Sequence, residues 1–182
     1  MQHSPYIERV INLIDPAGDT LLNMSPAEAL DAVASGDPDR IRKIDGQFAI
    51  LAQKGKIIRM ARSIGRPMRY FLAKLVDGPC LIVAERIEEI TAQLRQMGLL
   101  SQFHPSYTRM VPAHHLLELA LLGCPDPNPT YTRFFAPQRN TLPANLDTIG
   151  QAYIGAVEIE LAKDWKTYCT AYDKGAFATL KA

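Results

Sequence analysis

The sequence predicts an α+β domain, and two kinds of pattern carry this prediction. Two pairs of apolar segments, residues 47–52 with 57–62 and residues 69–75 with 80–84, each flank a short glycine-containing turn and are typical of β-hairpins. A helical segment with strong end signals, starting at Ser25, stands before them. Adjacent hairpins under capped helices build an α+β or layered α/β/β domain, because each sheet must bury an apolar face against another element.

Ahead of the hairpins, the sequence predicts two strands and a helix. Residues 7–14 are rich in β-branched side chains and stop at a cluster of turn residues, which favours a strand, and a shorter strand is expected at 20–23. Ser25 is a good N-cap, and Glu28 stands three residues later, which completes a capping box. We expect the helix to end at Gly36, because glycine readily takes the left-handed closing conformation.

After the hairpins, the sequence predicts a helix, two strands and a long C-terminal helix. The helix is expected at 86–97, with its apolar residues on one side, and residues 107–121 favour two strands around Pro112. Residues 123–129 contain three prolines, which predicts an extended loop. From about Asn145, apolar residues at helical spacing predict the last long helix.

Composition limits the class of protein. The 182 residues are 47% hydrophobic, and 20 basic against 19 acidic residues leave a net charge of +1. Such a chain has no global field for nucleic acid or an acidic membrane surface, so nucleic acid is not an expected partner. No segment approaches the roughly 20 apolar residues of a membrane helix. The N-terminus also lacks the charged and apolar regions of a secretory signal.

The cysteines and histidines predict neither a disulfide frame nor a metal site. The three cysteines, Cys80, Cys124 and Cys169, are widely spaced and form no C-x-x-C pair, which favours free thiols in a reducing compartment. His114 and His115 are adjacent, so on a strand they would point to opposite faces and would not bind one metal ion. We therefore expect a cytoplasmic protein without a metal ligand set.

Several motifs in the middle of the chain follow one another in the order known from one enzyme family. They are Ile44-Asp45-Gly46-Gln47-Phe48-Ala49, similar to L-D-G-x-F-A; residues 61–70, similar to A-R-D-x-x-G-x-x-P-L-Y-Y; Leu81-Ile82-Val83-Ala84-Glu85, similar to F-A-S-E; and residues 107–114, similar to L-P-P-G-H. Together they resemble the glutaminase domain of asparagine-synthetase-type enzymes, a class II glutamine amidotransferase domain, over about residues 25–165.

This resemblance implies a fold and a division of the chain. The family folds as the αββα sandwich of N-terminal-nucleophile hydrolases, with two antiparallel sheets face to face between helices, and we expect that fold or a reduced form of it. Residues 1–145 would form a degenerate amidotransferase-like domain, and residues 146–182 a connector helix and tail. Scaffold roles are expected for motif residues: Asp45, Gly46, Phe48, Gly65, Pro67, Glu85 and Pro112.

The catalytic parts of the family have no recognisable counterpart. The family's nucleophile is an N-terminal cysteine whose α-amino group acts as the base, whereas residue 2 here is Gln2. The family's R-G-P-D and N-G-E-x-Y-N segments are missing before residue 25, and no S-G-G-x-D-S loop follows to hold pyrophosphate. The resemblance therefore implies no catalytic residue and no cofactor in this chain. ATP and Mg²⁺ are expected only on a separate synthetase domain or partner.

The densest basic stretch of the chain supplies the candidate binding residues. These candidates for holding an anion, an acidic peptide or a partner are Arg62, Arg66, Arg69 and Tyr70. In the alternative interpretation, some of these arginines pair with buried carboxylates such as Asp45 or Glu85, while the others are solvated.

Three functional hypotheses follow from the sequence. In the first, the chain is a non-catalytic amidotransferase-like module that scaffolds or regulates an ATP-dependent amide-forming or adenylating synthetase partner, or that forms a homo-oligomer. In the second, it is a small-ligand or peptide-binding protein that reuses the vacated glutamine pocket. In the third, it is an enzyme that uses an internal cysteine.

Overall fold

The computed structural model describes residues 9–75, 78–120, 128–136 and 145–173. They belong to two compact units, residues 1–136 and residues 137–182. The first unit holds every strand of the described residues, and the described part of the second unit is one helix, α4 (Leu146–Asp173), with the residue before it. The sequence placed the division at residue 145 instead, and residues 137–144 lie outside the described ranges.

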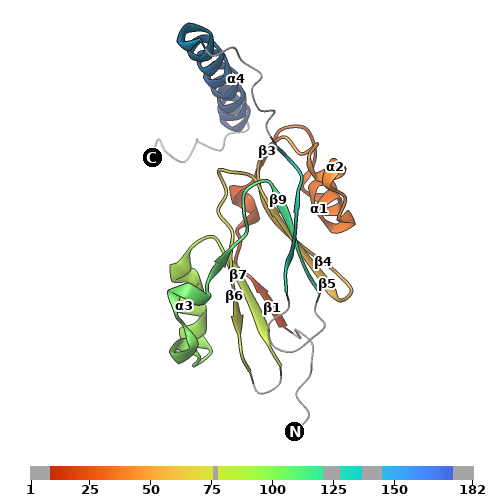
Figure 1. Cartoon of the computed structure of the whole chain (residues 1–182), viewed down its shortest axis with the longest axis vertical. Coiled ribbons are helices and arrows are strands. Elements are labelled where there is room, and N and C mark those ends of the chain that lie inside the picture. Colours follow the sequence, from red (N-terminus) through yellow and green to blue (C-terminus); the bar gives the residue numbers. More distant parts are fainter. Residues whose placement is uncertain (1–8, 76–77, 121–127, 137–144, 174–182) are drawn as a thin grey trace. The chain divides into compact units, whose positions relative to one another are not determined.

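Two four-stranded sheets form the centre of the first unit (Figure 1). In the first sheet the order is β1 (Arg9–Asn12), β7 (Cys80–Ala84), β6 (Arg69–Ala73) and β8 (Arg109–Met110). In the second sheet it is β10 (Thr130–Arg133), β9 (His115–Ala120), β5 (Ile57–Arg62) and β4 (Ala49–Lys54). A separate small ladder joins β2 (Thr20–Leu21) to β3 (Gly46–Gln47).

Both predicted hairpins are confirmed. Strands β4 and β5 pair antiparallel from Ala49 with Arg62 to Lys54 with Ile57, and Gly55 in the turn has a positive φ of 59°. Strands β6 and β7 also pair antiparallel. The two strands expected within residues 107–121 are β8 and β9, on either side of Pro112. They lie in different sheets, so this segment connects the two layers.

The prediction of two purely antiparallel sheets is wrong for the first strand. Strand β1 pairs parallel with β7, in a register that places Val10 beside Leu81 and Ile11 beside Ile82. A parallel pair needs a long crossover between its strands, and here the chain passes through the helices and the first hairpin before β7. The first sheet is therefore mixed. The coarser α+β prediction is confirmed.

The helices predicted within the first unit are confirmed, and the first of them has both of its expected end signals. Helix α1 (Pro26–Ser35) begins at Ser25, whose hydroxyl accepts from the main-chain N–H of Glu28 while the Glu28 carboxylate accepts from that of Ser25. It ends at Gly36, with a φ of 76°. Short helical turns and a third helix complete the unit: η1 (Pro16–Gly18), α2 (Pro38–Ile41), α3 (Ile87–Gln96), η2 (Leu100–Gln102) and η3 (Pro105–Tyr107).

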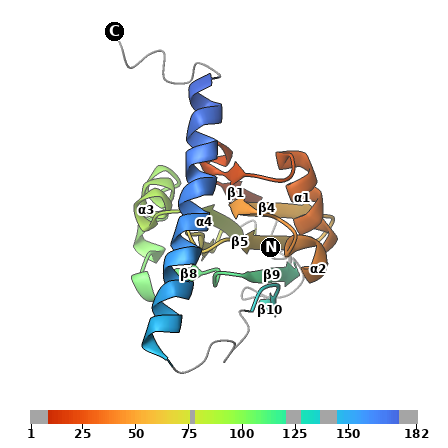
Figure 2. The ribbon, with the colours of Figure 1, turned by 90° about the horizontal axis from the view of Figure 1, so that it is seen from above.

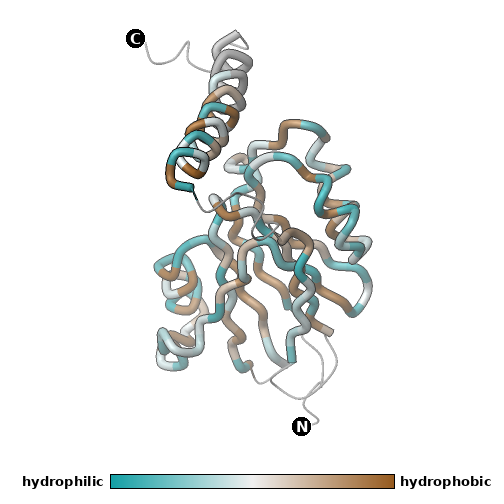
Figure 3. The backbone as a smooth tube through the Cα atoms, turned by 45° about the horizontal axis from the view of Figure 1, so that its top comes forward, coloured by the Kyte–Doolittle hydropathy of each residue, from teal (hydrophilic) through white to brown (hydrophobic). Residues whose placement is uncertain are grey.

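Three apolar clusters arrange these elements in layers (Figures 2 and 3). The first cluster lies between the sheets and includes Ile58, Met60 and Leu117 from one sheet and Tyr70, Leu81 and Val83 from the other. The second packs α1 and α2 on the outer face of the second sheet, and the third packs α3 on the outer face of the first. The order is helix, sheet, sheet, helix. The central strand β7 is buried along its whole length, as its unbroken apolar run predicts.

Helix α4 confirms the predicted long C-terminal helix and runs to Asp173. It begins after Asn145, whose side-chain oxygen accepts from the main-chain N–H groups of Asp147 and Thr148. Tyr153 and Trp165 are among its exposed apolar side chains. Within the described residues, no helix is both long enough and apolar enough to cross a bilayer. Residues 121–127, most of the predicted proline-rich loop, lie outside the described ranges.

Candidate ligand-binding site

The basic residues singled out by the sequence do not form one exposed surface. Arg62 is buried at the end of β5, and its guanidinium donates to the main-chain oxygens of Val111, Ser63 and Ile64. Burial is the main cause that lowers the pKa of Arg62, and the positive charge of Arg69 adds to it. Arg62 therefore ties the end of β5 to the segment that joins β8 and β9, which is a structural role.

Arg66 is also buried, and its partners are acidic. Its guanidinium contacts the Glu85 carboxylate, lies 3.7 Å from that of Asp19, and donates to the main-chain oxygen of Asp15 at 2.9 Å. Glu85 is one of the carboxylates that the sequence offered as an arginine partner. Its main-chain oxygen also accepts from the guanidinium of Arg69. The arginines of this stretch thus hold the start of β6 against η1 and the end of β7.

The Asp19 side chain is more buried than that of Glu85, with exposed fractions of 12% and 27%. The Asp19 side-chain oxygen accepts from the main-chain N–H of Ala49 at 3.0 Å. Even so, burial raises the pKa of Asp19, because the loss of water outweighs the Ala49 hydrogen bond and the charge of Arg66. The negative charges of Glu85 and Asp15 raise it further.

Several of the expected scaffold residues occupy buried or closely packed positions. Phe48 is buried, and its ring lies 6.2 Å from that of Phe134 between centroids. Gly46 has a φ of 127° and lies directly against the main chain of Thr20. The main-chain N–H of Gly65 donates to the side chain of Gln47 at 3.0 Å. The others among the expected residues, which the structure places in turns and strand connections, are Asp45, Pro67 and Pro112.

The described cysteine and the histidines do not form a reactive pair. Cys80 is fully buried under α3, and desolvation raises the pKa of its thiol, which disfavours the nucleophilic thiolate. Cys124 and the side chain of Cys169 lie outside the described parts. His114 has a φ of 59° and packs against Phe135, with 5.0 Å between ring centroids. Among the described residues, no group of three or more His, Cys, Asp or Glu side chains is placed to hold a metal ion.

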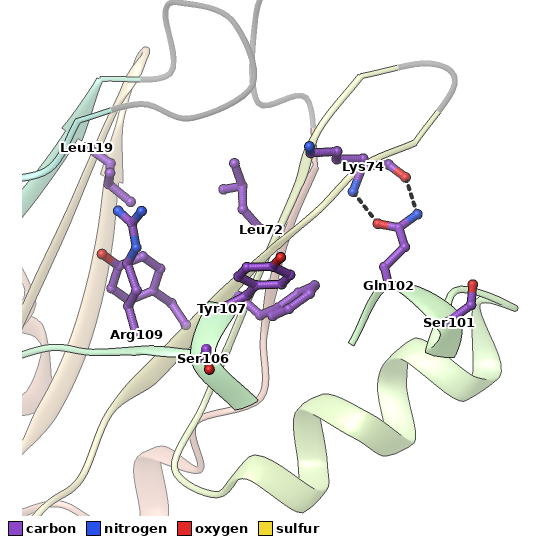
Figure 4. A pocket seen from close by; sticks show the side chains of 10 residues that line it. Leu72, Lys74, Ser101, Gln102, Ser106, Tyr107, Arg109 and Leu119 are labelled. Carbon is purple, nitrogen blue, oxygen red and sulfur yellow. Dashed lines mark hydrogen bonds between the residues drawn. The ribbon is translucent and has the colours of Figure 1, made fainter. Parts of the chain in front are cut away.

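A cavity of about 740 Å³ lies along the free edge of β6 (Figure 4). Its walls come from both sheets and from the segment between α3 and β8. The lining residues are Tyr70, Phe71, Leu72, Lys74, Ser101, Gln102, Ser106, Tyr107, Arg109 and Leu119. Of the four candidate binding residues that the sequence supplied, only Tyr70 is among them.

The cavity exists because β8 is short and the residues just before it do not continue the first sheet. In that ladder Tyr70 of β6 lies opposite Arg109 of β8. Two residues further along, the same register would place Tyr107 opposite Leu72. Residues 105–107 instead form the turn η3, which takes the chain away from β6. The space that a longer β8 would fill is the cavity.

A side chain takes the place of the missing strand at the far end of this edge. The Gln102 side-chain amide accepts from the main-chain N–H of Lys74 at 2.8 Å and donates to the main-chain oxygen of Lys74 at 2.7 Å, as the dashed lines in Figure 4 show. These are the two bonds that a neighbouring antiparallel strand would make. The cavity therefore runs along β6 between β8 at one end and Gln102 at the other.

Two cationic side chains and several apolar ones share the inner face of the cavity. Alternate residues of a strand face the same side, so Tyr70, Leu72 and Lys74 all project toward the second sheet. Arg109 lies opposite Tyr70 in the ladder and projects to the same face. In Figure 4, Leu72 stands between the charged ends of Arg109 and Lys74, and Leu119 lies on the opposite wall.

The hydroxyl of Tyr70 belongs to a side chain that lines this space. It is 3.4 Å from the hydroxyl of Tyr131 on β10. Burial raises the pKa of Tyr70 well above its ordinary value, and the Tyr131 hydroxyl adds to this, although Arg109 opposes it. The phenol is therefore neutral and remains a hydrogen-bond donor at physiological pH. Two cations, a neutral phenol and apolar walls fit a ligand with an anionic group and an apolar body.

Sequence patterns missed most of this cavity. Lys74, Gln102, Tyr107 and Arg109 fall outside the dense basic stretch, and the motif at residues 107–114 gave no binding role to Tyr107 or Arg109. They meet only because Tyr70 and Arg109, 39 positions apart, are paired in one ladder. No local signal gives that register.

Comparison with known proteins assigns no family. No protein-family model matches the chain, and no curated protein matches it. Function is therefore inferred from the residues and from their geometry.

Proposed function

We propose that this chain is a non-catalytic binding module that holds a small ligand or a peptide through an anionic group in the cavity at the edge of β6. The observation that carries the proposal is the placement of Arg109 and Lys74 on the same inner face as Leu72, in a cavity of about 740 Å³. That volume lies within the roughly 300–1,000 Å³ of ordinary small-molecule sites.

The cavity offers anchoring groups and few groups for chemistry. Ser101 and Ser106 are the hydroxyls of its rim, and its described lining contains no His, Asp, Glu or Cys side chain that would act as a base or thiol nucleophile. Arg109 and Lys74 supply charge-assisted hydrogen bonds for a carboxylate or phosphate, and an arginine can bind either group with two parallel bonds. Binding fits this set of side chains better than catalysis.

A thermal-shift screen of amino acids, dicarboxylates, nucleotides and acidic peptides tests the proposal. A ligand present at about 100 times its Kd should stabilise the protein by roughly 2.7 kcal/mol. Arg109→Gln should abolish the shift. The matched control is Arg42→Gln, because Arg42 is exposed and lies outside the cavity lining. Silence across the panel, or an equal shift in Arg109→Gln, would overturn the proposal.

A second candidate function is the amidotransferase-like scaffold, and the order of the layers favours it. We propose that the helix–sheet–sheet–helix arrangement is a form of the N-terminal-nucleophile hydrolase fold, in which Gly46 and Phe48 keep internal positions. The chain would then support an ATP-dependent amide-forming partner in the cytoplasm, where the thiol of Cys80 stays reduced. Co-purification with a synthetase that carries an S-G-G-x-D-S loop supports this role. Glutaminase activity of the pure protein that thiol alkylation abolishes excludes it.

A further inference from the structure

We infer that the ligand is the C-terminal end of an extended peptide, which adds to β6 as a short antiparallel strand with its carboxylate at Arg109 and an apolar last side chain between the sheets. The inference rests on the proposed binding function and names the class of ligand. It follows from the direction of the main-chain groups at Leu72, the direction of the ladder, and the side chains around the cavity.

Main-chain hydrogen bonds fix which groups of β6 face the cavity. The N–H of Val111 donates to the main-chain oxygen of Met68 on the β8 side, and both main-chain groups of Lys74 bond to Gln102. In an antiparallel strand, every second residue directs its N–H and C=O to the same edge. Leu72 lies midway between Tyr70 and Lys74, so its N–H and C=O point into the cavity.

Leu72 has no strand partner on that edge within the described residues. Strand β8 pairs with Arg69 and Tyr70 only, and the Gln102 amide engages Lys74. One residue of an extended ligand opposite Leu72 would restore both missing bonds, accepting from its N–H and donating to its C=O. The main chain of the ligand would take the path that a longer β8 would follow.

The direction of that path decides which end of the peptide lies at the arginine. Strand β8 runs antiparallel to β6, so a peptide that continues its line points its C-terminus toward Arg109 and its N-terminal side toward Gln102. A terminal carboxylate beside a guanidinium is favourable, and an arginine matches its planar geometry. The preceding residues of the peptide leave the cavity past Gln102, whose side chain already bonds to the main-chain groups of Lys74.

The pleat also selects the last side chain. Residues directly opposite each other in an antiparallel pair project to the same face. A residue opposite Leu72 therefore directs its side chain between the sheets, toward Leu119. Leu72 packs against the inter-sheet core and Leu119 belongs to it, so this position prefers an apolar residue such as leucine, valine or phenylalanine.

Fluorescence anisotropy with N-terminally labelled hexapeptides tests the inference. The reference probe is Ser-Gly-Ser-Ala-Val-Leu with a free C-terminus, and the same peptide with a C-terminal amide should bind about tenfold more weakly. Methylation of the amide nitrogen of the last residue removes the donor to Leu72 and should also cost about tenfold. Methylation one residue earlier is the matched control and should leave the Kd unchanged, because that N–H points away from β6.

Protein variants complete the test. Arg109→Gln should bring the acid and amide peptides to the same Kd, while the exposed control Arg42→Gln should keep the difference. Equal binding of acid and amide to the wild-type protein, or equal loss from the two methylations, would overturn the inference. If no peptide binds while N-acetyl-leucine or a dicarboxylate gives an Arg109-dependent thermal shift, the inference fails and the proposed function stands. If no panel compound gives such a shift either, both fail.

Discussion

Gly46 lies so close to the main-chain oxygen of Thr20 that a Cβ built on Gly46 would be 1.9 Å from it. The φ of Gly46 is also 127°, in a region that residues with a Cβ atom rarely adopt. Gly46→Ala should therefore separate β2 from β3 and reduce the free energy of unfolding by about 3 kcal/mol or more. Urea denaturation followed by circular dichroism measures this loss.

Gly55→Ala is the matched control for that prediction. Gly55 also has a positive φ, 59°, but a Cβ there would meet no atom within 4 Å. The backbone strain remains without the clash, so the expected loss is only about 1 kcal/mol. Equal losses in the two variants would mean that the close approach of Gly46 to Thr20 contributes nothing.

Arg62 should be essential for stability, although it does not line the cavity. Its buried guanidinium satisfies several main-chain oxygens, among them that of Val111. Arg62→Met keeps an apolar stem and removes these bonds, so we expect a loss of roughly 2–4 kcal/mol in the free energy of unfolding. The exposed Arg42→Met should change it by less than about 0.5 kcal/mol. A similar small effect for Arg62→Met would refute a structural role.

The parts of the fold that the sequence predicted depend on neighbouring residues. The Ser25–Glu28 capping box and the end of α1 at Gly36 are set within one helical turn at each end of the helix. The β4–β5 hairpin depends on a turn at Gly55 between two apolar runs. In each case a few consecutive side chains determine the local backbone geometry, so the sequence pattern was sufficient.

The parts that the sequence missed depend on distant pairings. The parallel pairing of β1 with β7 joins Val10 to Leu81, and nothing local distinguishes it from an antiparallel one. The sequence left the partners of Arg66 undetermined for the same reason. Asp19 and Glu85 reach Arg66 only after three segments of the chain have packed together. The candidate cavity likewise needed the long-range register of β8 before Arg109 could be placed.

The ionised carboxylate of Asp19 should lower the free energy of unfolding at neutral pH. Its pKa in the folded protein is raised by burial, so the folded state binds this proton more tightly than the unfolded state does. Its contribution to stability is fully present below the unfolded pKa of about 3.9 and is lost as the pH rises through the folded value. Asp19→Asn should therefore match the wild type near pH 3 and have the higher melting temperature at pH 7. Calorimetry at a series of pH values measures the difference.

Glu28 provides a control with the opposite sign. Hydrogen bonds from the main chain and the hydroxyl of Ser25 lower the pKa of Glu28, so its carboxylate supports the fold above the unfolded pKa and this support is lost as the pH falls. Glu28→Gln should accordingly have the lower melting temperature at pH 7 and approach the wild type in acid. If Asp19→Asn followed this same pattern, the Arg66 ion pair, and not burial, would dominate the energetics of Asp19.

Replacement of Thr108 by valine should stabilise the protein. The Thr108 side-chain oxygen is buried, and among the described groups it has no hydrogen-bond partner. An unsatisfied buried hydroxyl costs about 1–3 kcal/mol, and valine has nearly the same shape without that group. We expect Thr108→Val to raise the free energy of unfolding by up to about 1 kcal/mol in urea denaturation. Thr91→Val is the contrasting variant, because the Thr91 hydroxyl donates to the main-chain oxygen of Glu88 at 2.8 Å and its removal should not stabilise. A clear loss in Thr108→Val would instead place a bound water on this hydroxyl, since a buried water is held by such groups and is costly to remove.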